Sequence, residues 1–319
     1  MQPSRRTFLR LAAGASAVAV SHSKGWAEAS GSWKFKMSLR CSSVGIKAGQ
    51  AEAIRLAGQY GFEAVAVNAS ELGGLDAAGL ESMQNAREEA GLFWGSAGLP
   101  VQFRDSEERF EKDLAQLGKR AAAAASVGVS RMGTYIMPTN NNLTFMRNMR
   151  LHSTRLAKCA KVINEYGLKL GLEYVGPKTL WPSGRYSFIH DLAGARDLIA
   201  EINEPNVGLI LDSWHWYTAE ETKEDLLSVR GDEVVACDLN DAPAGVPVNQ
   251  QIDQKRELPV ATGVIDTKTF LECLVEIGYD GPVRAEPFNA KLNALDNEAA
   301  AAATAKAMKS AFALIAARG

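Results

Sequence analysis

Four acidic residues each end an apolar, strand-like run in the second half of the 319-residue chain. They are Glu173 in LKLGLE, Asp212 in VGLILD, Asp238 in EVVACD and Glu286 in GPVRAE. Carboxylates that lie close together resist joint ionisation, and a divalent cation relieves their repulsion most simply. Four oxygen donors with room for water predict one divalent metal ion, with Mn²⁺ or Mg²⁺ preferred over Zn²⁺. The alternative is that these are ordinary exposed acids just past the strand ends.

The sequence contains a repeating pattern of elements that would bring these acids together. Short apolar runs alternate with longer helix-like stretches, and several helical stretches are followed by glycine, which suits a helix C-cap. Eight strand-then-helix units predict a single-domain (β/α)8 TIM barrel, an α/β fold whose active sites lie at the carboxyl ends of the strands. The predicted strands cover residues 36–40, 63–69, 92–98, 130–137, 168–175, 207–214, 233–241 and 281–288, and the glycines are Gly61, Gly91, Gly128, Gly167 and Gly278.

A doubly wound open sheet is the main alternative fold. No G-x-G-x-x-G motif follows the first strand and no phosphate-binding P-loop occurs in the sequence, which weakens the nucleotide-binding versions of that fold. The four acids are separated by 39, 26 and 48 residues, and each separation suits one step from strand to strand. The absence of these nucleotide-binding motifs therefore favours the closed barrel.

A second layer is expected below the acids, because alternate residues of a strand face the same side. It would contain Gly171, Ile210, Ala236 and Arg284. Gly171 and Ala236 are small, so they would leave space for Arg284 to rise toward the carboxylates and hold them. The alternative is that Arg284 points outward under a helix.

Five motifs resemble those of the sugar phosphate isomerase/epimerase superfamily, the xylose isomerase-like TIM barrels, and the likeness covers nearly the whole chain after the first thirty residues. The resemblance implies one metal ion held by Glu, Asp, His and Glu at the ends of strands five to eight. Glu173, Asp212 and Glu286 match directly, whereas Asp238 stands where the histidine is expected, which leaves an all-oxygen site. The motifs are GLEYVGP (171–177), LDSWHWY (211–217), DLNDAP (238–243), RELPVATGVID (256–266) and RAEPFN (284–289).

The resemblance implies a metal-dependent isomerase or epimerase that acts on a keto-sugar by proton transfer through an enediolate. Glu173 and Glu286 would remove and return the proton. The resemblance also implies substrate contacts from His215 and Arg256. The alternatives are a loop histidine packed between tryptophans and a solvated loop arginine, with Lys255 as a competitor for the arginine's role.

Trp181 follows the fifth predicted strand in GPKTLWPSGRY. Its aromatic face would suit the C–H side of a sugar, and Lys178 would add a polar contact. Trp181 would serve equally well as an anchor for its loop. We therefore predict Trp181 as a substrate-binding residue and keep the anchor as the alternative.

Other functions remain open from the sequence. The same site would support a lyase that expels the aglycone of a 3-keto-glycoside, and a non-catalytic periplasmic sugar-binding protein or a metal-free glycosidase with a carboxylate pair are further possibilities. An endonuclease-IV-like trinuclear zinc site is disfavoured, because the chain has only four histidines. The net charge of −2 and the lack of a basic cluster argue against nucleic-acid binding.

Residues 1–29 are predicted to be a twin-arginine export signal. SRRTFLR precedes a short, weakly apolar segment, and AEA fits a cleavage site. The barrel domain would then cover residues 30–319 and act in the periplasm or outside the cell. No other stretch is apolar enough to span a bilayer, so no membrane contact is expected after cleavage.

The four cysteines are widely spaced, which predicts buried thiols rather than disulfides. Members of the family that the chain resembles often pair, so a homo-oligomer is expected.

Overall fold

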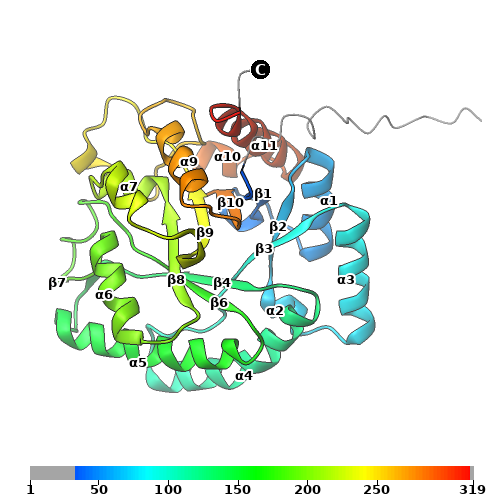
Figure 1. Cartoon of the computed structure of the whole chain (residues 1–319), viewed down its shortest axis with the longest axis horizontal. Coiled ribbons are helices and arrows are strands. Elements are labelled where there is room, and N and C mark those ends of the chain that lie inside the picture. The colour runs from blue at the N-terminus through cyan, green and yellow to red at the C-terminus, as the bar shows by residue number, and fades with distance from the viewer. Residues whose placement is uncertain (1–32, 317–319) are drawn as a thin grey trace, which may run out of the picture. The chain divides into compact units, whose positions relative to one another are not determined.

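The computed structural model describes residues 33–316, so the predicted export signal at residues 1–29 lies outside the described residues. Eight parallel strands close into a barrel in the order β1-β10-β9-β8-β6-β4-β3-β2, and helices surround it (Figure 1). The prediction of a closed (β/α)8 barrel is therefore confirmed. The barrel strands are β1 (Lys36–Leu39), β2 (Ala64–Val67), β3 (Phe93–Gly98), β4 (Arg131–Tyr135), β6 (Lys169–Glu173), β8 (Val207–Asp212), β9 (Val234–Leu239) and β10 (Pro282–Ala285).

Two further strands, β5 (Thr139–Asn140) and β7 (Tyr186–Ser187), pair antiparallel outside the barrel. The sequence did not predict them, because a strand of two residues is too short to show an alternation of apolar and polar residues. They join the loop that follows β4 to the loop that follows β6.

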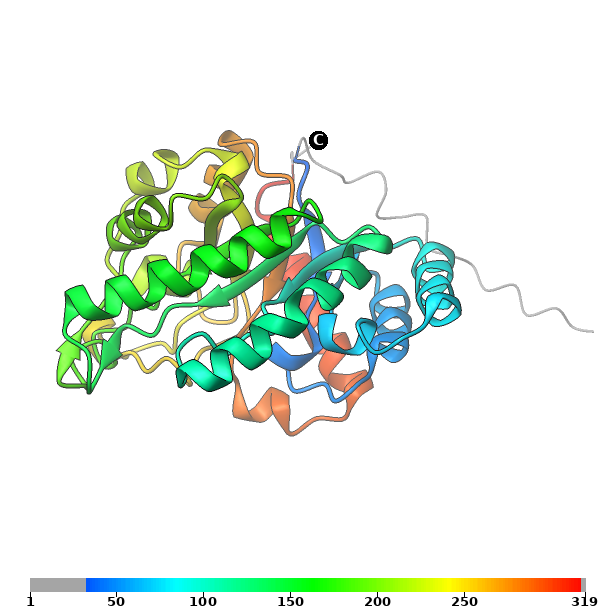
Figure 2. The same cartoon turned by 90° about the horizontal axis from the view of Figure 1, so that it is seen from below.

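The long helices cover the barrel, and α4 and α5 lie side by side across one flank (Figure 2). Several begin at an acidic or hydroxyl N-cap; the Asp191 side chain, for example, accepts from the Gly194 N–H at 2.8 Å. All five predicted C-terminal glycines have positive φ, between 66° and 92°. The long helices are α1 (Gln50–Tyr60), α3 (Ala77–Glu89), α4 (Glu107–Ser126), α5 (Phe145–Asn164), α6 (Leu192–Ile202), α9 (Thr267–Glu276) and α11 (Asn297–Ala313); the short ones are α2 (Ala69–Leu72), α7 (Ser213–Thr218), α8 (Lys223–Leu227) and α10 (Ala290–Asn293).

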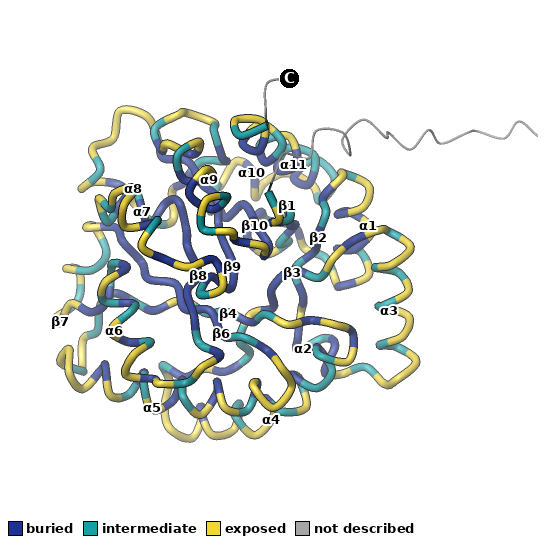
Figure 3. The backbone as a smooth tube through the Cα atoms, in the orientation of Figure 1, coloured by how far each residue is buried: buried dark blue, intermediate teal, exposed yellow. Residues whose placement is uncertain are grey.

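The strands are buried and the outer faces of the helices are exposed, as expected of a barrel wrapped by amphipathic helices (Figure 3). The four cysteines are free, and all but the half-buried Cys41 are buried. None of the helices in residues 33–316 combines the length and the hydropathy needed to cross a bilayer.

The barrel interior is tightly filled beneath the strand ends. Gly133 of β4 and Gly171 of β6 are register partners. A Cβ at Gly133 would lie 2.5 Å from Ile210 Cδ1, and one at Gly171 would lie 2.8 Å from both Ile210 and Val235. The space at Gly171 therefore accommodates Ile210 and Val235, so the expectation that it makes room for Arg284 is wrong.

We predict that Gly171→Ala lowers the free energy of unfolding by about 1–3 kcal/mol, because the added methyl group overpacks the barrel interior. Chemical denaturation would measure the change. Gly118→Ala is the matched control: Gly118 lies in α4, where an added Cβ meets its nearest neighbour at 3.6 Å, and alanine is the better helix former. Equal stability of Gly171→Ala and the wild type would contradict the tight packing.

Candidate active site

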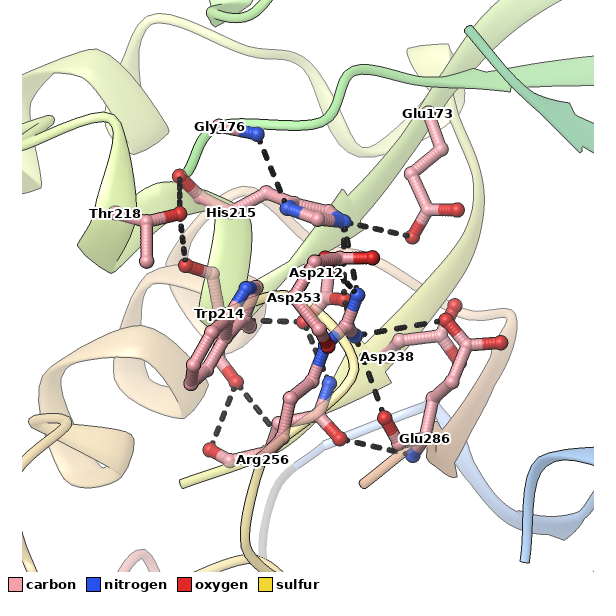
Figure 4. A network of polar contacts seen from close by, with 12 residues as sticks. Glu173, Gly176, Asp212, Trp214, His215, Thr218, Asp238, Asp253, Arg256 and Glu286 are labelled. Carbon is pink, nitrogen blue, oxygen red and sulfur yellow. Dashed lines mark hydrogen bonds and ion pairs between the residues drawn. The ribbon is translucent and has the colours of Figure 1, made fainter. Parts of the chain in front are cut away.

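The four predicted acids lie at the carboxyl ends of four neighbouring barrel strands. Glu173 and Asp212 are the last residues of β6 and β8, Asp238 lies near the end of β9, and Glu286 follows β10. None is more than 7% exposed. The alternative of ordinary exposed acids is therefore wrong, and the strand ends gather the carboxylates in one buried cluster (Figure 4).

The carboxylates form two overlapping groups. The first group contains one carboxylate oxygen from each of Glu173, Asp238 and Glu286, and these three oxygens lie within 4.8 Å of one another. Glu173 also belongs to a second such group, with Asp212 and His215. The sequence led us to expect all four acids around one point, whereas in the described residues three meet mutually and Asp212 adjoins them through Glu173.

Arg284 faces the barrel interior and pairs with Asp238. Its Nε donates to Asp238 Oδ1 at 2.7 Å, its Nη2 donates to Asp238 Oδ2, and its Nη1 donates to Ser96 Oγ. Burial acts to raise the pKa of Asp238, but the charge and hydrogen bonds of Arg284 outweigh it and lower that pKa. Arg284 therefore points inward, as one of the two alternatives predicted. It pairs with Asp238, the acid at the position where the family resemblance implies a histidine.

The contacts of Asp212 explain why β8 ends on an acidic residue. Its Oδ1 accepts from the Trp214 N–H at 2.8 Å, which caps α7, and from Asn240 Nδ2 at 2.8 Å. Its Oδ2 accepts from Arg256 Nη1 at 2.8 Å. Burial raises the pKa of Asp212 to about 7, against the opposing charge of Arg256.

Arg256 enters the cluster from the long loop after β9. Its side chain is buried, donates to Asp253 Oδ1 at 2.8 Å and lies 3.6 Å from Glu286 Oε2. Its guanidinium carbon lies 4.6 Å from the ring centroid of Phe288. The predicted arginine is therefore part of the site, whereas its competitor Lys255 is exposed.

Asp241 holds the loop that carries Arg256. Its carboxylate accepts from the backbone N–H groups of Thr262, Gly263 and Ile265 at 2.7–3.0 Å. Its own backbone forms an antiparallel bridge with Glu257. These bonds fix the chain that follows Arg256, so Asp241 is a loop clamp rather than a member of the carboxylate cluster.

His215 lies in α7 and points toward the acids. Its Nδ1 accepts from the Gly176 N–H at 3.1 Å, and its Nε2 lies 3.3 Å from Arg256 Nη2. Nε2 lies 3.7 Å from Asp212 Oδ2 and 3.9 Å from Glu173 Oε1. Burial, together with the charge of Arg256, lowers the pKa of His215 to about 3. His215 is thus neutral, and together with Glu173 and Asp212 it forms a group whose ligand atoms lie close enough to hold a metal ion.

Glu173 and Glu286 have different surroundings. Glu286 Oε1 accepts from Arg40 Nη1 at 2.9 Å and from Ser43 Oγ at 3.2 Å. Glu173 Oε1 is buried and has no hydrogen-bond partner among the residues described. Burial, with the charges of Glu286 and Asp238, raises the pKa of Glu173 well above its usual range. Glu173 is therefore the carboxylate best placed to take up a cation or a proton.

Several members of the cluster were not predicted from the sequence. Arg40 directly follows β1 and contacts Glu286, so the strand-end rule that found the acids would also have found it. Asn240 donates to Asp212, and its Oδ1 accepts from the Glu286 N–H at 3.0 Å. Asp253 has no comparable signal, because its place depends on the path of a long loop.

A cavity of about 990 Å³ opens above the cluster, and Glu173, His215 and Arg256 line it. Trp181 does not line it; its ring is stacked on His190, with centroids 4.5 Å apart. Lys178 is exposed and also lies outside the lining. The structure therefore does not bring Trp181 into the cavity, and the loop anchor describes its position.

We predict that Arg284→Met lowers the free energy of unfolding by about 3–5 kcal/mol, because it leaves the buried Asp238 carboxylate unpaired. The double variant Asp238→Leu/Arg284→Met removes both charges and should recover most of that loss. Urea unfolding of the wild type, both single variants and the double variant would measure the coupling. Additive losses in the double variant would show that the two residues do not act as a pair.

A family model described as xylose isomerase-like TIM barrel matches residues 54–311. An inosose isomerase from Bacillus subtilis (strain 168) is 28% identical over 145 residues, which are 46% of this chain and 49% of the relative. A ketose 3-epimerase from Arthrobacter globiformis is 27% identical over 185 residues, 57% of this chain and 54% of the relative. The chain thus spans about half the length of these curated relatives.

Solved structures match over a longer span. A xylose isomerase domain protein from Alicyclobacillus acidocaldarius is 29% identical with a TM-score of 0.77, and the match covers 88% of this chain and 99% of that one. The IolI protein with a bound zinc atom has a TM-score of 0.72 at 18% identity, with 88% and 98% covered. The second match shows the fold alone. Together with the family model, these matches confirm the resemblance inferred from the five motifs.

Proposed function

Because the chain belongs to the xylose isomerase-like TIM barrel family, we propose that it is a metal-dependent isomerase or epimerase that moves a proton beside the carbonyl of a keto-sugar. The observation that carries the proposal is the buried Glu173 carboxylate: its Oε1 has no hydrogen-bond partner among the residues described, and one of its oxygens lies within 4.8 Å of oxygens from Asp238 and Glu286. The inosose isomerase and ketose 3-epimerase relatives support the substrate class. Export by residues 1–29 to the periplasm is part of the proposal.

The donor set fits one divalent cation. Five carboxylates and three arginines make up the cluster, so its ionised form has an excess of two negative charges. The IolI neighbour binds zinc, but oxygen donors alone favour a harder ion, so we propose Mn²⁺ or Mg²⁺. The proposed ligands are Glu173, Asp212, Asp238 and Glu286, the fifth acid is Asp253, and the arginines are Arg40, Arg256 and Arg284.

When bound, such an ion would polarise the carbonyl and the adjacent hydroxyl of the substrate. Glu173 and Glu286, on strands separated by β8 and β9 in the barrel, would remove and return the carbon proton. His215 would form a hydrogen bond with a substrate oxygen, and Arg256 would place its positive charge beside developing negative charge.

Metal binding should be visible as a pH-dependent stabilisation. The folded pKa of Asp212 is raised to about 7, whereas unfolded aspartate ionises near 4. Without metal, the folded state retains a proton that the unfolded state loses, so stability should fall as pH rises from about 4 to 7. Mn²⁺ should therefore raise the melting temperature by a few degrees at pH 8 and by less at pH 5.

Differential scanning fluorimetry with Mn²⁺, Mg²⁺ and EDTA would test this prediction. Asp212→Asn should weaken the metal-dependent shift, and Asp232→Asn, an exposed acid near the opposite end of the barrel, is the control. An unchanged melting temperature with both ions at pH 8 would contradict the proposed metal site.

Glu286→Gln should lower proton exchange by about 10²–10⁴-fold, because it removes one acid–base group while keeping its size. The assay is deuterium uptake from solvent at the carbon beside the carbonyl of a keto-sugar. Glu165→Gln changes an exposed acid beyond the end of α5 and should leave exchange unchanged. Full exchange by Glu286→Gln would remove Glu286 from the mechanism, and no exchange by the wild type with any keto-sugar would indicate a binding protein.

The size of the cavity favours a second candidate. A volume of about 990 Å³ is at the upper end for ligand pockets, so a monosaccharide would leave space for an aglycone. The same proton removal beside a 3-keto group would then expel that aglycone. Release or retention of the aglycone from a 3-keto-glycoside separates lyase from epimerase.

A further inference from the structure

The cavity contains an arginine with no acidic partner. Four arginines line it, and three of them form ion pairs with the carboxylate cluster described above: Arg40, Arg256 and Arg284. Arg104, in the loop after β3, is the exception, because no carboxylate within residues 33–316 lies within 4.0 Å of its guanidinium. Arg104 is therefore the cavity-lining arginine without an acidic partner among the described residues.

Arg104 is held in place although it is not neutralised. Its Nη1 donates to the backbone carbonyl oxygen of Tyr135. Its guanidinium carbon lies 4.1 Å from the ring centroid of Tyr135 and 4.5 Å from that of Phe103. Fixing a long side chain costs conformational entropy, so the aromatic contacts maintain an orientation that a solvated arginine would lack. The Nε and Nη2 donors have no hydrogen-bond partner among the residues described.

The anchor of Arg104 adjoins the proposed catalytic acid. Tyr135 is the last residue of β4, and its register partner on β6 is Glu173. The next residue, Ile136, donates its N–H to the Glu173 carbonyl at 2.7 Å. A substrate group bound to Arg104 would thus belong to a molecule that also extends toward Glu173.

We propose that Arg104 binds an anionic group of the substrate, so that this site acts on an acidic sugar. A guanidinium pairs with a carboxylate or a phosphate through parallel N–H donors, and either group would give Arg104 the acidic partner that the described residues do not provide. This inference rests on the proposed function and names the substrate class of the same cavity. Arg104 would determine specificity, whereas Glu173 and Glu286 perform the proton transfer.

Three ketoses that differ only at carbon six test the proposal: D-fructose, D-fructuronate and D-fructose 6-phosphate carry an alcohol, a carboxylate and a phosphate. In the wild type, solvent deuterium exchange should have a higher kcat/KM for one of the two anions, and that preference should shrink as salt concentration rises. Arg104→Gln should lower kcat/KM for the preferred anion by about 10- to 150-fold, the range for losing a charge-assisted hydrogen bond, and leave D-fructose unchanged.

Two further variants complete the test. Arg104→Lys keeps the charge without the planar fork and should give an intermediate loss for the anion. Arg185→Gln removes an exposed arginine that stacks on Tyr186 outside the cavity lining and should change nothing. Equal losses on all three sugars in Arg104→Gln, or a wild-type preference for D-fructose, would overturn the proposal. If Arg104→Gln does not fold, the same comparison with Arg104→Lys decides.

Calorimetric binding separates this inference from the proposed function. If no ketose exchanges, the isomerase proposal fails, but binding of D-fructuronate and D-fructose 6-phosphate to the wild type and to Arg104→Gln still measures the role of Arg104. Weaker binding of either anion to the variant supports the inference. Identical binding to both proteins, or no binding of either anion to the wild type, contradicts it.

Discussion

The burial of like charges at one end of the barrel is the constraint on which the rest of this protein depends. Carboxylates that lie so close together in a medium of low dielectric stay ionised only if positive charge is supplied from nearby. The barrel supplies it from three directions. Arg284 comes from within β10, Arg256 comes from the loop after β9, and Arg40 comes from the end of β1. Glu173 alone among the four strand-end acids lacks a hydrogen bond to one of these arginines.

The pair of Asp238 and Arg284 follows from the same constraint. A neutral histidine at position 238 would need no counter-charge, whereas a buried aspartate does. Arg284 meets that need with two parallel hydrogen bonds and reaches Ser96 with its Nη1. Asp238 and Arg284 therefore form one pair. β9 departs from the family motif by carrying an aspartate at position 238, and β10 supplies the arginine that this buried aspartate needs.

Much of the fold and of the acidic cluster could be predicted from the sequence. Apolar runs that end on Glu173, Asp212 and Glu286 give both the strands and the place where their ends meet, because parallel strands in a barrel share one carboxyl end. Residues whose position depends on tertiary packing could not be predicted. Trp181 has the right type and spacing for a sugar platform, yet its loop turns it onto His190. Gly171 was expected to leave free space, but side chains from β8 and β9 fill it.

The hydrogen bonds of Asp241 hold the Arg256 segment in place, so other parts of the same loop can change without moving Arg256. The bonds from Asp241 to residues 262–265 and the bridge to Glu257 fix the segment around Arg256 at its base. Asn249, Gln250 and Gln254 lie in the same loop and line the cavity. Substitutions at these three positions would change the wall of the cavity while the guanidinium stays on Asp212, so the loop can alter which molecules enter without rebuilding the centre that acts on them.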